Sequence, residues 1–81
     1  INEQLKQIVY NELVRVGEPI TATDLLNGCQ ELQDFTYMEK GEEKIVTNQK
    51  VSSLLKKLID EDKIVTKETI KKKTYFSLVE D

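Results

Sequence analysis

The stretch TNQKVSSLLKKLIDEDKIVTKETIKKKTYFSLV, residues 47–79, decides the fold of this chain. In its first half, apolar residues recur at the spacing that places them on one face of an α-helix. These residues are Val51, Leu54, Leu55, Leu58 and Ile59. The opposite face then carries Gln49, Ser53, Lys56, Lys57 and Asp60, with Lys50 and Ser52 at its edges. The pattern predicts an amphipathic helix behind a Thr47 cap.

After Asp62 the helical spacing gives way to two segments typical of β-strands. Residues 63–67 are rich in β-branched side chains, and within residues 74–79 Phe76 and Leu78 alternate onto one side of a strand. The connection between them is mostly polar and is expected to form an exposed tip with three consecutive lysines, Lys71 to Lys73. A β-hairpin is therefore predicted after the helix.

Two more helices are predicted upstream of this stretch. Residues 2–16 carry an apolar face and run into Gly17, which favours a helix end. After a short extended connector, an apolar stripe from Ala22 to Leu32 predicts a second helix that ends near Leu32 or Gln33. The chain is therefore expected to contain three helices and a C-terminal hairpin.

Residues 34–46, DFTYMEKGEEKIV, separate the second predicted helix from the third. A connection of this length without structure of its own is unusual in a compact domain. It either holds a short hairpin that turns at Gly41, or its residues Phe35, Tyr37 and Met38 cover the corner between the two helices. We favour the second interpretation.

The bulk properties of the chain restrict its class. Eighty-one residues suit one small domain, so residues 1–81 are expected to form a single unit. The single cysteine, Cys29, cannot form an internal disulfide, which favours burial in the core and a reducing, cytoplasmic location. No apolar run reaches the length of a membrane span, and the start INEQLKQ lacks the layout of a signal peptide. The chain begins at Ile1 rather than Met, as a piece of a longer protein would.

Enzymatic chemistry is not expected. The chain has no histidine, its one cysteine lacks a partner base, and its three glycines are too scattered for a phosphate-binding loop. No cysteine or histidine pair has metal-ligand spacing, so neither a metal nor a cofactor is predicted. The acidic clusters at 42–43 and 60–62 are interpreted as solvated charges.

Charge is distributed unevenly along the sequence. The formal net charge is −3, yet residues 1–43 hold three Lys or Arg against nine Asp or Glu, a balance of −6. Residues 44–73 hold nine Lys against four Asp or Glu, a balance of +5. Binding responds to the local field rather than to the total charge, so the basic segment is a candidate surface for a polyanion.

The order helix, extended stub, helix, helix, strand, lysine-rich tip and strand resembles the winged-helix family of DNA-binding domains. VSSLLKKLIDEDKIV looks like the third helix of that family with its exit into the wing, and KKKTYFSLV looks like the returning wing strand. The resemblance covers residues 2–32 and 47–79. It implies an α+β fold with three helices, a two-stranded C-terminal wing and a lengthened connection between the second and third helices. In place of the usual glycine at the helix exit stands Asp62, a residue that tolerates left-handed backbone angles.

The resemblance further implies that the third helix enters the major groove of double-stranded DNA while the wing follows the backbone. The matching side chains able to hydrogen-bond base edges are Asn48, Gln49, Ser52 and Ser53, and those able to meet phosphates are Lys50, Lys56, Lys57, Lys67, Lys71, Lys72 and Lys73. Arginine is missing from this set, so binding dominated by the DNA backbone is expected. The function implied is that of a transcriptional regulator or an accessory DNA-architecture protein.

Two alternatives concern protein partners. On the first helix, Tyr10 and Val14 lie off the main apolar face and are either additional core or a homodimer contact. The rival to DNA binding is a winged-helix protein-interaction module that uses the acidic N-terminal half or residues 35–38. No membrane partner is expected.

Overall fold

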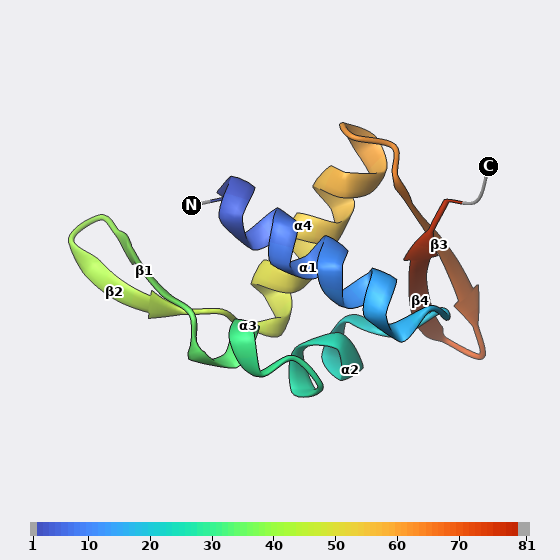
Figure 1. Cartoon of the computed structure of the whole chain (residues 1–81), viewed down its shortest axis with the longest axis horizontal. Coiled ribbons are helices and arrows are strands. Elements are labelled where there is room, and N and C mark those ends of the chain that lie inside the picture. The colour runs from blue at the N-terminus through green and yellow to red at the C-terminus, as the bar shows by residue number, and fades with distance from the viewer. Residues whose placement is uncertain (1, 80–81) are drawn as a thin grey trace.

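The computed structural model describes residues 2–79 and has a mixed α+β architecture (Figure 1). Along the described chain the elements are α1 (Asn2–Val16), α2 (Ala22–Asn27), α3 (Gln30–Asp34), β1 (Thr36–Glu39), β2 (Glu42–Ile45), α4 (Asn48–Asp60), β3 (Val65–Ile70) and β4 (Lys73–Leu78). The strands form two separate antiparallel hairpins, β1–β2 and β3–β4. The α+β class expected from the sequence is confirmed.

The core lies between α1, α4 and the shorter elements, and the two long helices form as predicted. In α4 the residues Val51, Leu54, Leu55 and Leu58 are buried and Ile59 is half-buried, which confirms the predicted apolar face. Thr47 caps this helix, because its side-chain oxygen accepts a hydrogen bond from the backbone N–H of Lys50. Helix α1 ends where Gly17 takes a φ of +70°, a left-handed conformation that glycine adopts without strain.

The second predicted helix is instead two short helices, so the prediction of three helices was wrong. Its break lies at Gly28 and Cys29, where Cys29 is extended with a φ of −116° and a ψ of 98°. The carbonyls freed at the end of α2 accept hydrogen bonds from the Gln33 side chain, at 2.9 Å for Leu26 and 2.7 Å for Asn27. The break keeps Cys29 and Leu32 in the core, as the apolar stripe indicated.

The segment between α3 and α4 is a hairpin, so the favoured interpretation that it only covers a corner was wrong. Strands β1 and β2 pair from Thr36 opposite Ile45 to Glu39 opposite Glu42. The turn is at Lys40 and Gly41, both with positive φ, which is the geometry that suits a two-residue hairpin loop. Two of the residues expected to cover the corner, Phe35 and Tyr37, nevertheless pack against the core.

The C-terminal hairpin is longer and its tip is shorter than predicted. Strands β3 and β4 pair from Val65 opposite Leu78 to Ile70 opposite Lys73, and the tip is only Lys71 and Lys72. The predicted tip also contained three residues of β3 whose side chains are exposed, so they showed no apolar alternation. Phe76 is buried and Leu78 packs on the core, which confirms the predicted alternation.

The exit from α4 differs from the prediction. The left-handed residue after α4 is Lys63, with a φ of +57°, and not Asp62 as predicted. Asp62 instead binds Lys6 of α1, with 2.9 Å between the carboxylate and the ammonium.

The predicted connector before α2 is extended, and Ile20 exchanges two backbone hydrogen bonds with Phe76, at 3.0 and 2.7 Å. This bridge fixes the start of α2 beside β4.

The two hairpins lie at opposite ends of the molecule (Figure 1). The Cα extents along the principal axes are 39, 24 and 22 Å, and in the view with the longest axis horizontal β1–β2 projects at one end while β3–β4 lies at the other. Helix α4 lies between them, behind α1 in this view.

Candidate nucleic-acid interface

The polar face of α4 is open to solvent. Its side chains able to hydrogen-bond base edges are all exposed, namely Asn48, Gln49, Ser52 and Ser53. They are exposed because the apolar residues of the same helix turn the opposite face toward α1 and the core. Lys56 is exposed on the same polar face, and Lys57 is half-buried at its edge.

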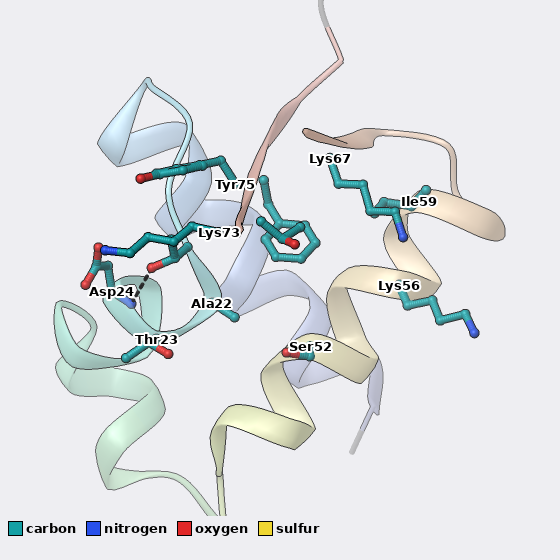
Figure 2. A pocket seen from close by; sticks show the side chains of 12 residues that line it. Ala22, Thr23, Asp24, Ser52, Lys56, Ile59, Lys67, Lys73 and Tyr75 are labelled. Carbon is teal, nitrogen blue, oxygen red and sulfur yellow. Dashed lines mark hydrogen bonds between the residues drawn. The ribbon is translucent and has the colours of Figure 1, made fainter. Parts of the chain in front are cut away.

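A groove of about 680 Å³ separates this face of α4 from the β3–β4 hairpin and the start of α2 (Figure 2). Ser52 and Lys56 line it from α4, while Lys67 and Lys73 line it from the hairpin strands. In Figure 2, Lys56 and Lys67 lie on one side of the groove, and Lys73 lies on the other side beside α2. Four of the residues singled out from the sequence therefore border one concave surface.

The α2 side of this groove was missed by the sequence interpretation. Thr21, Thr23 and Asp24 line it, and the Thr21 hydroxyl accepts a hydrogen bond of 3.1 Å from the backbone N–H of Asp24. Tyr75 lines it from β4 and is half-buried. No local pattern could have revealed this wall, because it depends on the bridge between Ile20 and Phe76, which are far apart in sequence.

The two tip lysines of the C-terminal hairpin stand apart from the groove lining. Lys71 and Lys72 are exposed and have φ values of +50° and +67°. A left-handed conformation costs a residue with a side chain about 1 kcal/mol or more, which is why asparagine and glycine usually occupy such turns. This tip therefore carries two flexible cations at positions where the backbone favours smaller residues.

Lys50 lies on the other edge of α4, where it is engaged within the protein. Its ammonium donates a hydrogen bond of 3.1 Å to the Asn2 side-chain oxygen and lies 5.3 Å from the centroid of the Tyr37 ring. The structure therefore separates Lys50 from the groove that holds Lys56, Lys67 and Lys73.

Positive charge is concentrated on the C-terminal hairpin. Strands β3 and β4 with their tip carry Lys67, Lys71, Lys72 and Lys73 against one acid, Glu68, a balance of +3. At the far end of α4, Asp62 is paired with Lys6, and this hydrogen-bonded partner raises the pKa of Lys6. The open positive charge is thus concentrated on the C-terminal hairpin and the adjacent face of α4.

The two residues considered for a homodimer differ in exposure. Val14 is 52% exposed and borders a groove with Leu78 and Val79. Tyr10 is half-buried beside Leu58 and Ile64, so it serves the core in part.

Other kinds of site are not seen in the part of the chain that the structure describes. Residues 2–79 contain no cluster of three or more histidine, cysteine or acidic side chains arranged to hold a metal ion. None of the helices over the same residues combines the length and apolar character that crossing a bilayer requires. Comparison with protein-family models, with curated proteins and with solved structures finds no match to this chain.

Proposed function

We propose that this chain is a winged-helix domain that binds double-stranded DNA, with α4 in the major groove and the β3–β4 hairpin as the wing. In this proposal α1, the α2–α3 pair and α4 take the places of the three helices of the family. The bridge between Ile20 and Phe76 takes the place of the extended stub beside the wing.

The observation that carries the proposal is the shared groove between α4 and the wing. Ser52 and Lys56 on the helix line it together with Lys67 and Lys73 on the wing, with Lys56 and Lys67 on one side and Lys73 on the other, so hydrogen-bonding and cationic side chains border one concave surface. A duplex presents base edges beside a regular row of phosphates, and this combination of side chains suits that surface. Asn48, Gln49 and Ser53 extend the uncharged part of the surface toward the start of α4.

In this proposal the lysines contact phosphates and the short polar residues contact bases. Lysine is a point charge on a flexible stem, so it neutralises phosphates without the fixed geometry of arginine. Amide side chains such as Gln49 suit adenine, and the backbone contacts supply most of the affinity. The proposed protein therefore binds many sequences, with a modest preference for sites that contain A·T pairs.

A fluorescence-anisotropy titration of labelled duplex DNA at several salt concentrations tests the proposal. If all six lysines of this surface meet phosphates, namely Lys56, Lys57, Lys67, Lys71, Lys72 and Lys73, the expected slope of log affinity against log salt is about −5. Absence of duplex binding even at about 50 mM salt would refute the DNA proposal and favour the protein-interaction module.

The two hairpin tips supply a matched pair of variants. Lys71 and Lys40 each hold the first tip position, with φ values of +50° and +51°, at opposite ends of the molecule. Lys71→Glu is expected to weaken duplex binding, whereas Lys40→Glu changes net charge equally and leaves the affinity within about twofold. Equal losses in the two variants would show that overall charge, and not the wing, governs binding.

A further inference from the structure

The β1–β2 hairpin exposes an apolar face. Met38 is 60% exposed and Ile45 is 63% exposed, and the register places both on the same side of the hairpin, since Met38 lies opposite Glu43 and Ile45 opposite Thr36. This two-stranded sheet is separate from the other hairpin and projects from the body of the domain. A projecting two-stranded hairpin is only marginally stable in water, so covering this face stabilises it.

The turn end of the hairpin forms an acidic rim beside that face, because Glu43 lies on the face itself and Glu39 and Glu42 lie next to the turn on the opposite face. Glu39 and Glu42 are directly opposite each other in the register, and like charges in that position destabilise a hairpin. Lys44 lies 3.0 Å from Glu42, and Lys40 occupies the turn between Glu39 and Glu42, so residues 36–45 keep a net charge of −1. Within residues 2–79, Glu39 has no ion-pair partner, and Glu43 adds a third carboxylate. A cationic partner relieves this repulsion, and a nucleic acid increases it.

The complementary surface is present on the same chain. The tip of the β3–β4 hairpin carries Lys71 and Lys72, and next to it Ile70, which is 46% exposed, pairs with Lys73. It therefore offers an apolar side chain with a basic rim, whereas the β1–β2 hairpin offers apolar side chains with an acidic rim. The two surfaces lie at opposite ends of the longest axis, so one molecule cannot join them to each other (Figure 1).

We propose that the β1–β2 hairpin of one molecule docks on the tip of the β3–β4 hairpin of a second copy of this chain. The contact is head to tail, and each joined pair still has one free hairpin of each kind. A contact between two different surfaces is heterologous, and because these surfaces lie at opposite ends of the long axis we expect the product to be a linear array. The contact uses wing lysines but does not require that the protein bind DNA.

Sedimentation velocity without DNA tests the contact over a concentration series. The sedimentation coefficient is expected to rise with protein concentration at about 50 mM salt and to fall at about 500 mM salt, where the charges are screened. Glu39→Lys with Glu43→Lys reverses the acidic rim, and Lys71→Glu with Lys72→Glu reverses the basic tip. Each double variant alone is expected to raise the dissociation constant at least about tenfold.

An equimolar mixture of the two double variants is the decisive sample. Each reversed surface meets its complement on the other variant, so the mixture is expected to regain the association that both variants lack alone. Glu18→Lys with Glu31→Lys makes the same charge change outside the hairpin and is expected to associate like the wild type. Circular dichroism of every variant verifies that the helices remain folded.

Several results would overturn this inference. They are a wild type that stays monomeric at low salt, a mixture that stays monomeric, and loss of association in Val14→Glu, which would place the contact on α1. Because no DNA is present, failure here is separate from failure of the duplex titration. Association by a chain that does not bind duplex supports the hairpin contact alone.

Discussion

The ammonium of Lys50 lies 5.3 Å from the centroid of the Tyr37 ring, which connects the first turn of α4 to strand β1. The same ammonium donates a hydrogen bond to Asn2 at the start of α1. One lysine thus joins three elements at the base of the β1–β2 hairpin. The sequence interpretation grouped Lys50 with the phosphate contacts, but its position favours a structural role.

Replacing Lys50 is therefore expected to affect stability more than DNA binding. Lys50→Met keeps the aliphatic stem and removes the cation, with an expected loss of about 0.5–1 kcal/mol in the free energy of unfolding. The slope of log affinity against log salt is expected to stay unchanged, whereas Lys56→Met reduces it by about 0.9. Urea unfolding and anisotropy titrations measure both quantities. An equal reduction of the slope in both variants would contradict the structural role of Lys50.

The wing and α4 are expected to differ in what they contribute to DNA binding. Changing Lys71, Lys72 and Lys73 to Glu should weaken binding to all duplexes about equally and reduce the salt slope by about 0.9 for each lost phosphate contact. Gln49→Ala should alter the preference among duplex sequences while leaving the slope nearly unchanged. Anisotropy titrations with A·T-rich and G·C-rich duplexes compare the two variants. A change in sequence preference caused by the wing variant alone would reverse these assignments.

The sequence at the tip of the β3–β4 hairpin suits its backbone geometry poorly. Lys71 and Lys72 both have positive φ, which costs a residue with a side chain about 1 kcal/mol or more, whereas Asn-Gly suits this turn. Replacing the pair by Asn-Gly should raise the free energy of unfolding by about 1 kcal/mol and weaken duplex binding. Thermal unfolding and the duplex titration together measure these opposite effects. Lower stability in this variant would show that the lysine side chains stabilise the tip.

Two residues of α4 that are two positions apart, Ser53 and Leu55, differ in burial. Leu55 is completely buried, so Leu55→Ala is expected to lower the free energy of unfolding by about 2–5 kcal/mol. Ser53 is exposed, and Ser53→Ala is expected to change it by no more than about 0.5 kcal/mol. Urea melts of both variants provide the comparison. Similar losses in the two would mean that the faces of α4 are assigned incorrectly.

Alkaline pH is expected to destabilise the fold through Cys29. Burial raises the pKa of this thiol above its ordinary value of 9.0. Below that value both the folded and unfolded states keep the proton, so the stabilisation is complete. As the pH rises further, the unfolded state releases the proton first, and stability falls by at most about 1.4 kcal/mol per pH unit. Unfolding of wild type and Cys29→Ala from pH 7 to 10, with a reductant present, should show this loss only in the wild type.

The long helices were predictable because each buries one continuous stripe. Helices α1 and α4 repeat apolar residues over several turns, and that spacing alone assigns their faces. The break at Gly28 was less visible, because the apolar stripe continues through Cys29 to Leu32 across the gap. Periodicity indicates which residues are buried but not whether the backbone between them stays helical.

Both hairpins were harder to delimit for one physical reason. Strand residues that are exposed on both faces, such as Glu68 to Ile70, show no alternation of apolar and polar residues. Most of β1 and β2 is exposed in the same way, so the sequence showed only a possible turn at Gly41. Of the residues that line the groove, the sequence identified Ser52, Lys56, Lys67 and Lys73. Its α2 wall depends on the tertiary bridge at Ile20.

The β1–β2 hairpin enters and leaves the body of the domain at neighbouring points, because Thr36 and Ile45 are directly opposite each other. A segment with such closely spaced ends can change length without moving the elements that flank it. Tyr37 and Val46 pack on the core and hold its base in place. Residues 38–43 can therefore be lengthened, shortened or replaced by another loop while the helices of the body keep their positions.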